Sequence, residues 1–161
     1  MFNPFRISML ILRSRRPSRI KRMRVIYDGF WLRRGYDALT FFGTIVAASP
    51  EMAAAMESDE GKQLLNHEMI HLHQARDTHD SWLCFYLLYI WYYLRLLPFS
   101  FRQRNAAYIL NPFELEAYRH MHDMGYLDRS DCGRLWRKYA KLTAEERLEL
   151  WRMPFRRDSI L

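Results

Sequence analysis

The sequence predicts a single, mostly helical α+β domain, and three observations lead to this fold class. The chain has 161 residues, of which 50% are hydrophobic and 16% aromatic, enough to bury one core. Its low content of 6 Gly and 6 Pro argues against a disordered or linker-type chain. Helix start and stop signals recur along residues 49–152, whereas a short segment before them has the residue types of strands. We therefore expect a basic N-terminal arm, residues 1–35, and one domain, residues 36–161.

The predicted small sheet lies in residues 37–47, beside the first helices. Thr, Phe, Ile and Val cluster here around Gly43, which favours one or two short strands. Ser49 before Pro50 predicts a helix start. Ser58, followed by two acidic residues, predicts the start of another helix that continues to about residue 76.

Residues 82–97 form an apolar segment with only Arg95 as a charged residue. A helix needs about 20 apolar residues to span a bilayer, and this segment is shorter and is followed by Pro98. We therefore predict a buried central helix. The alternative is an interfacial or membrane-inserted helix, which the Trp and Tyr content of the segment favours.

The C-terminal part of the chain carries clear helix signals. Asn111 as a cap, followed by Pro and Glu114, predicts a helix over residues 112–124 that Gly125 ends. Two more helices are predicted over residues 129–141 and 144–152, the second opened by a capping box of Thr143 and Glu146.

The helix that ends near residue 76 contains the motif HExxH, at residues 67–71. Residues four apart on an α-helix share one face, so the imidazoles of His67 and His71 can bind one metal ion. Glu68 is rotated by about 100° and can act on a water molecule at the open coordination position. The motif therefore predicts a zinc site with Glu68 as the general base.

A third protein ligand is expected from the helix over residues 112–124, which contains Glu114, Glu116 and His120. Glu114 could instead complete a capping box, because it is the third residue after Asn111. Glu116 has no such role and has His120 four residues later. On spacing alone, either glutamate can be the ligand.

The motif HExxHxxQ, which ends at Gln74, and the later NPFExEAY together resemble the gluzincin metallopeptidases, and especially short bacterial proteins of poorly characterised function. The resemblance covers roughly residues 38–125. It implies a zincin-like fold, a Zn²⁺ cofactor and, as metal ligands, His67, His71 and Glu114. It also implies that an edge strand beside the HExxH helix binds extended substrate, for which residues 44–47 are the candidate.

The sequence departs from the gluzincin pattern four positions after Glu114, where Tyr118 replaces an acidic residue. Either the phenol supports a metal ligand in its place, or Glu116 is the true ligand. We expect Glu114 to be the ligand and keep Glu116 as the alternative. The residues expected in the second layer or at the substrate are Gln74, Tyr118 and His120.

The net charge of +7 is concentrated at the N-terminus, where residues 1–36 hold ten Arg or Lys and a single acidic residue, Asp28. Such an arm suggests an anionic membrane surface as a partner, with nucleic acid as the less favoured choice. The two cysteines, Cys84 and Cys132, form no CxxC motif, and the apolar run at residues 7–12 is short for a signal peptide. We expect a cytoplasmic protein, or one peripheral to the inner face of the membrane.

These expectations combine into one predicted function, that of a zinc-dependent metallopeptidase, which uses metal-activated water to hydrolyse a bond in a peptide or protein substrate. The alternative is a non-catalytic, metal-binding or membrane-associated interaction module that retains the same fold. Glu68 favours the enzyme, because a protein that only binds zinc needs no carboxylate next to the first histidine.

Overall fold

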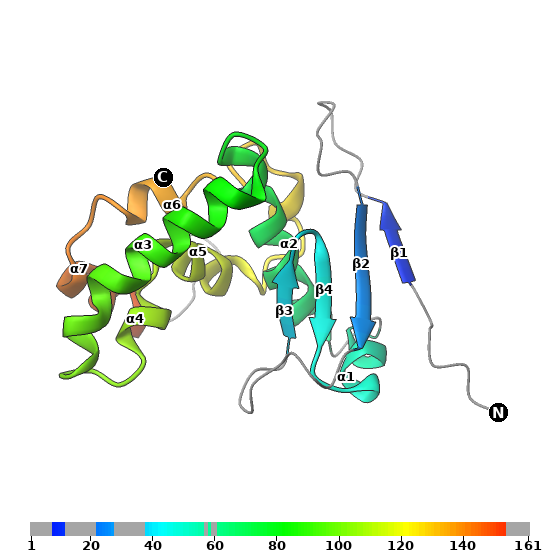
Figure 1. Ribbon diagram of the computed structural model, residues 1–161, viewed down its shortest axis with the longest axis horizontal. Coiled ribbons are helices and arrows are strands. Elements are labelled where there is room, and N and C mark those ends of the chain that lie inside the picture. The colour runs from blue at the N-terminus through cyan, green and yellow to red at the C-terminus, as the bar shows by residue number, and fades with distance from the viewer. Residues whose placement is uncertain (1–7, 12–21, 28–37, 57, 59–60, 154–161) are drawn as a thin grey trace.

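The computed structural model describes residues 8–11, 22–27, 38–56, 58 and 61–153. It is a mostly helical α+β structure, as predicted, with a small sheet at one end and most of the helices at the other (Figure 1). The helices are α1 (Pro50–Ala55), α2 (Lys62–Asp77), α3 (Trp82–Ser100), α4 (Ala106–Ile109), α5 (Pro112–His120), α6 (Trp136–Tyr139) and α7 (Ala144–Arg152), with a 3₁₀ turn at Tyr126–Asp128.

The sheet contains four described strands, in the spatial order β1 (Ser8–Ile11), β2 (Arg22–Tyr27), β4 (Thr44–Ala47) and β3 (Ala38–Phe41). The β3–β4 hairpin confirms the prediction for residues 37–47, with Phe42 and Gly43 at positive φ in its turn. β2 pairs in parallel with β4, and β1 is antiparallel to β2. Residues 8–11 and 22–27, the described parts of the predicted N-terminal arm, are thus strands of the same sheet. The rest of the predicted arm lies outside the described residues.

The position of β4 corrects one expectation. β4 pairs with β2 along one edge and with β3 along the other. Its backbone groups are therefore engaged on both sides, and residues 44–47 offer no free edge to an extended substrate. The strand at this end of the sheet is β3, which packs beside α2.

Most of the predicted caps are present. The Ser49 side chain accepts a hydrogen bond from the Met52 amide at the start of α1, and Asn111 accepts one from the Phe113 amide at the start of α5. The reciprocal capping box of Thr143 and Glu146 opens α7. These three local signals found helix starts because each cap satisfies amides that the helix itself leaves unpaired. The start predicted at Ser58 was wrong, because α2 begins at Lys62 after Gly61 and the Ser58 hydroxyl donates to the Ala55 carbonyl instead.

Two predicted helices are shorter than expected, for tertiary reasons. α5 ends at His120 instead of residue 124. Just after this end, the side-chain amide of Asn66 donates to the backbone carbonyls of His120, Met121 and Asp123. Of residues 129–141, only Trp136–Tyr139 is α-helical. Glu116 binds the amides of Gly133 and Trp136 there, and Gly133 has a φ of 75°, which interrupts a helix.

The prediction that residues 82–97 form a buried central helix is wrong about burial. Of the nineteen residues of α3, only Phe85 and Leu96 are buried. Outward-facing leucines such as Leu83 and Leu87 are 64% and 60% exposed. Because the segment is apolar on every side, its periodicity could not show that only one face packs on the protein. By length and composition, α3 is also the one helix within the described ranges that could cross a membrane.

Gly133 provides a direct test of the packing between the segment before α6 and α2. A Cβ atom at residue 133 would lie 2.4 Å from the His73 carbonyl carbon and 2.6 Å from the Gln74 nitrogen, both of them backbone atoms. We expect Gly133→Ala to lower the free energy of unfolding by about 3 kcal/mol, because the clash adds to the strain of a positive φ. Urea unfolding measures this loss.

Gly125→Ala is the matched control for this substitution. Gly125 has a φ of −84°, and the nearest atom to an added Cβ is a side-chain oxygen of Asp123 at 3.5 Å. We expect a change within about 0.5 kcal/mol. Equal unfolding curves for the two variants would contradict the close approach at Gly133.

Candidate metal centre

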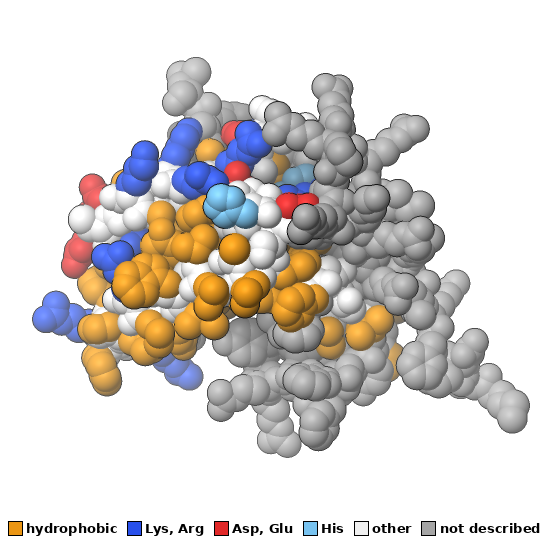
Figure 2. Space-filling model, turned by 45° about the horizontal axis from the view of Figure 1, so that its top comes forward, with side chains coloured by type: hydrophobic (Ala, Val, Ile, Leu, Met, Phe, Trp, Pro, Cys, Tyr) orange, Lys and Arg blue, Asp and Glu red, His pale blue; other side chains and the backbone are white. Residues whose placement is uncertain are grey.

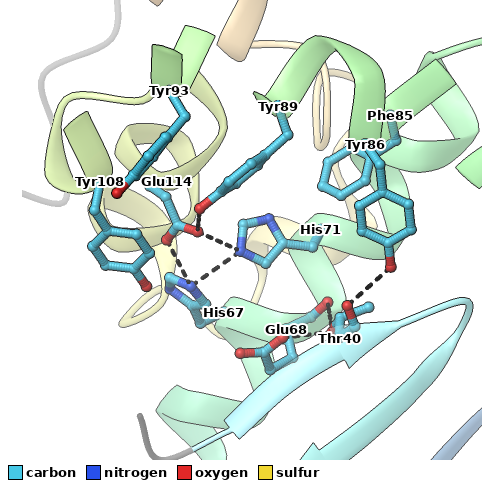
Figure 3. A pocket seen from close by; sticks show the side chains of 10 residues that line it. All are labelled: Thr40, His67, Glu68, His71, Phe85, Tyr86, Tyr89, Tyr93, Tyr108 and Glu114. Atoms are coloured by element: carbon cyan, nitrogen blue, oxygen red, sulfur yellow. Dashed lines mark hydrogen bonds and ion pairs between the residues drawn. The ribbon is translucent and has the colours of Figure 1, made fainter. Parts of the chain in front are cut away.

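The HExxH residues occupy the middle of α2, on the side that faces α5. His67 and His71 are one helical turn apart, and their Nε2 atoms lie 3.2 Å from each other. Both side chains are buried, with 4% and 6% of their surface exposed. Two imidazole nitrogens therefore point at the same small volume (Figure 3).

The third member of the cluster is Glu114, in the first turn of α5. Its Oε2 lies 3.3 Å from Nε2 of His67, and its Oε1 lies 3.5 Å from Nε2 of His71. One ligand atom from each of the three residues falls within 4.8 Å of the others. The structure thus brings together the three residues expected as metal ligands.

Glu116, the alternative ligand, lies outside this cluster. Two residues along a helix is a rotation of about 200°, so its carboxylate points away from that of Glu114. It accepts hydrogen bonds from Gln74 Nε2 at 3.0 Å, Tyr126 Oη at 2.7 Å, and the Gly133 and Trp136 amides at 2.7 and 2.9 Å. Burial raises the pKa of Glu116, an effect that these four donors oppose. Its role is to hold α2, α5 and the segment before α6 together.

The electrostatics of the cluster favour a carboxylate at Glu114. Burial alone would raise the pKa of Glu114, but the two imidazoles and the Tyr89 hydroxyl outweigh it and lower this pKa to about 2. For His67, burial lowers the pKa, yet the neighbouring Glu114 carboxylate raises it overall. The ionised carboxylate is thus matched to a cation beside it, either a proton on an imidazole or a metal ion.

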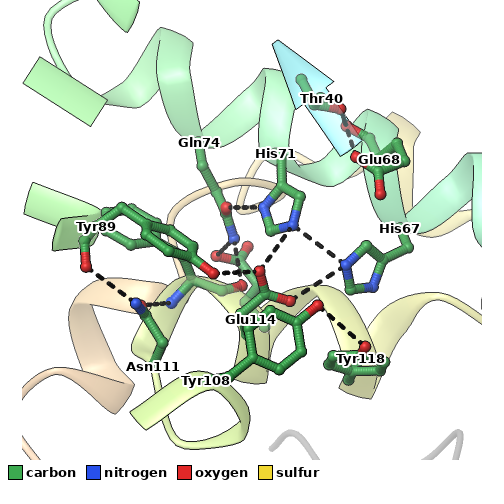
Figure 4. Close-up of polar contacts among 12 residues, drawn as sticks. Thr40, His67, Glu68, His71, Gln74, Tyr89, Tyr108, Asn111, Glu114 and Tyr118 are labelled. Carbon is green, nitrogen blue, oxygen red and sulfur yellow. Dashed lines mark hydrogen bonds and ion pairs between the residues drawn. The ribbon is translucent and has the colours of Figure 1, made fainter. Parts of the chain in front are cut away.

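Gln74, predicted as a second-layer residue, sets the tautomer of His71. Its Nε2 donates to the Phe113 carbonyl at 2.9 Å and to Glu116, so its Oε1 is the atom that faces His71. Nδ1 of His71 lies 2.8 Å from this oxygen and must therefore donate its proton there. Nε2 of His71 is left with a lone pair directed at the cluster (Figure 4).

The other two predicted second-layer residues have different positions. The ring of Tyr118 packs against that of His67, with centroids 4.5 Å apart, and its hydroxyl lies 3.2 Å from that of Tyr108. The His120 ring stacks on Tyr126 at 4.0 Å, and burial lowers its pKa to about 4. Tyr118 therefore supports a residue of the cluster, whereas His120 belongs to the core beside it.

Glu68 lies in the wall of a cavity of about 320 Å³ that opens at the cluster. The Thr40 hydroxyl, on β3, donates to Glu68 Oε2 and so ties the carboxylate to the edge of the sheet. Tyr86 connects the same strand to α3, because its hydroxyl donates to the Thr40 carbonyl at 3.1 Å. The cavity is lined by Thr40, His67, Glu68, His71, Phe85, Tyr86, Tyr89, Tyr93, Tyr108 and Glu114.

Sequence reasoning did not identify the aromatic half of this cavity. Tyr86, Tyr89 and Tyr93 come from α3, and the Tyr89 hydroxyl donates to Glu114 Oε1 at 2.8 Å. Their spacing of three and four residues is that of one helix face, which was the available signal. That signal was hidden because the whole segment is rich in aromatic and aliphatic residues.

The residues present fit a zinc ion. The donor set is two imidazole nitrogens and one carboxylate, a combination found in catalytic zinc sites. Oε2 of Glu114 is buried and, within the part of the chain that the structure describes, makes no hydrogen bond; its ion-pair neighbour is Nε2 of His67 at 3.3 Å, itself one of the expected ligand atoms. A buried carboxylate oxygen is costly unless a cation or donor compensates it, and a metal ion would do so.

Comparisons with known proteins place the chain in no family. No protein-family model matches it, and neither a curated protein nor a solved structure is significantly similar to it.

Proposed function

We propose that the protein is a zinc-dependent metallopeptidase of the gluzincin type, with a zincin-like fold. The observation that carries the proposal is that His67, His71 and Glu114 converge in a cavity whose wall also contains Glu68. Metal-ligating residues alone would be consistent with a structural zinc site. A carboxylate in the wall of the same cavity is what hydrolysis requires in addition.

In this proposal His67, His71 and Glu114 hold Zn²⁺. When bound, zinc lowers the pKa of its water and polarises a carbonyl group. Glu68 accepts the proton of the attacking water and passes it to the leaving amine. Thr40 orients the Glu68 carboxylate through the hydrogen bond to Oε2, and Gln74 keeps the Nε2 lone pair of His71 directed at the metal.

The aromatic residues of the cavity suggest what part of a substrate enters it. Phe85, Tyr86, Tyr89 and Tyr93 present ring surfaces next to the cluster (Figure 3). Such a wall favours an apolar or aromatic side chain next to the bond that is cleaved. We therefore propose unfolded peptide segments rich in such residues as substrates.

Replacement of Glu68 tests the proposed mechanism. Glu68→Gln retains the shape of the side chain but cannot accept a proton, so hydrolysis should fall by about 10²- to 10⁴-fold. The metal content, measured by elemental analysis, should stay near that of the wild type, because Glu68 is not a ligand. Cleavage is followed with a quenched fluorescent peptide library and the zinc-loaded protein.

The matched control is Glu149→Gln, which makes the same chemical change at an exposed position of α7. It should cleave at the wild-type rate. An equal rate in Glu68→Gln would remove Glu68 from the mechanism. A wild-type protein that binds zinc tightly but cleaves no member of the library would favour the alternative function, a non-catalytic metal-binding module.

A further inference from the structure

The helix α3 has two faces with different roles. The inner face carries Phe85 into the core and Tyr89 to the metal cluster. On the outer face, leucine and isoleucine residues recur at intervals of four and three residues, so they form one continuous stripe. This outer stripe consists of Leu83, Leu87, Ile90, Leu94 and Leu97, which are 64%, 60%, 52%, 53% and 39% exposed.

Aromatic and cationic side chains accompany the outer stripe. Trp91 is 56% exposed, and Tyr93, which also lines the cavity, remains 38% exposed. The guanidinium of Arg95 lies 5.7 Å from the centre of the Trp91 ring. Figure 2 shows an apolar band on this face of the molecule, with Lys and Arg side chains and some Asp and Glu side chains near its border. Trp and Tyr beside aliphatic residues, with cations at the margin, are typical of helices at a membrane–water interface.

Within residues 81–113, which include α3, the charged side chains have one sign. Residues 81–113 contain three arginines, Arg95, Arg102 and Arg104, and no aspartate or glutamate. All three arginines are exposed. An anionic surface complements this region, whereas a second copy of the same face would bring arginines close to arginines.

We propose that the outer stripe of α3 docks on an anionic lipid bilayer, with the helix lying along the membrane surface. A transmembrane arrangement would require α3 to leave the core and to break the Tyr89–Glu114 hydrogen bond, which holds a side chain of the metal cluster. Surface docking keeps these inner contacts and removes the outer leucines from water. The proposal does not depend on the metal centre or on catalysis.

Flotation with lipid vesicles tests the proposal on the full chain. Vesicles of phosphatidylcholine with phosphatidylglycerol are compared with vesicles of phosphatidylcholine alone. We expect the wild type to float with the anionic vesicles. Leu87→Gln/Ile90→Gln should lower its partition coefficient by about tenfold or more, because two of the five stripe residues become polar.

The matched control is Met124→Gln/Met153→Gln, which makes two exposed apolar residues polar outside α3. These methionines are 48% and 51% exposed, similar to Ile90, and the variant should partition like the wild type. Circular dichroism and urea unfolding show whether each variant is folded. A Leu87/Ile90 variant that is unfolded is replaced by the single Leu83→Gln and Leu94→Gln variants, with a smaller expected loss.

Three results would overturn the proposal. The first is equal vesicle binding by the two double variants. The second is binding that high salt removes completely and that the stripe substitutions do not change, which would assign it to the basic N-terminal residues alone. The third is a wild type that ignores vesicles but self-associates in sedimentation, with a monomeric Leu87→Gln/Ile90→Gln variant, because the occupant would then be a second copy.

Discussion

Glu114→Ala is expected to abolish stoichiometric zinc binding. The substitution removes one of the three proposed ligands, including an oxygen that lies 3.3 Å from Nε2 of His67. Loss of a mere second-layer partner costs about 10- to 100-fold in metal affinity, and loss of a ligand should cost more. Competition with a fluorescent zinc chelator at constant pH measures the affinity.

Glu149→Ala, at an exposed position of α7, controls for the loss of one negative charge and should bind zinc like the wild type. The assignment would fail if Glu114→Ala kept its zinc while a folded Glu116→Ala variant lost it. In that case α5 would have to rotate relative to α2 when metal binds, so that Glu116 faces the two histidines.

Glu116→Ala should instead damage the fold. Its carboxylate accepts four hydrogen bonds from α2, the 3₁₀ turn and the segment around α6, all at a fully buried position. Removal leaves the Tyr126 hydroxyl and the Gly133 and Trp136 amides buried without this acceptor, while Gln74 keeps the Phe113 carbonyl. We expect the free energy of unfolding to fall by about 3–5 kcal/mol. Urea unfolding of chelator-treated protein measures this loss without a contribution from bound metal.

A weaker effect on zinc should follow in Glu116→Ala molecules that remain folded. Gln74 loses one of the two acceptors that orient its amide, so the tautomer of His71 is less firmly held and zinc affinity should fall by about 10- to 100-fold. Glu116→Gln serves as the control: it retains one acceptor oxygen and should lie between the wild type and Glu116→Ala in stability. Wild-type stability in Glu116→Ala would contradict the structural role.

Local signals in the sequence were sufficient to predict the parts of the site that lie on one helix. HExxH places His67 and His71 one turn apart wherever an α-helix forms, because its period brings every fourth residue to the same side. The caps at Ser49, Asn111 and Thr143 were found for a similar reason, since a cap bonds to amides two or three residues away. The β3–β4 hairpin was also local, with its turn at residues 42 and 43.

The relation between distant segments was settled by tertiary packing. The spacing of residues along the sequence could not show whether Glu114 or Glu116 lies beside the two histidines, because this depends on which side of α5 faces α2. Asn66 and Glu116 shortened the later helices through contacts across many residues of chain, where local propensity is overridden. Thr40 and Tyr89 came to the cluster in the same way, from a strand and a helix on either side of α2 in the chain.

The sequence by itself determined the mostly helical α+β class, the starts of α1, α5 and α7, and a His–His pair with an adjacent glutamate. Only the tertiary structure decided that Glu114 joins this pair, that Glu116 holds the fold, and that α3 exposes an apolar stripe. The physical reason is that periodicity records which residues share a side of one element. It carries no information about which neighbouring element, or which solvent, that side will meet.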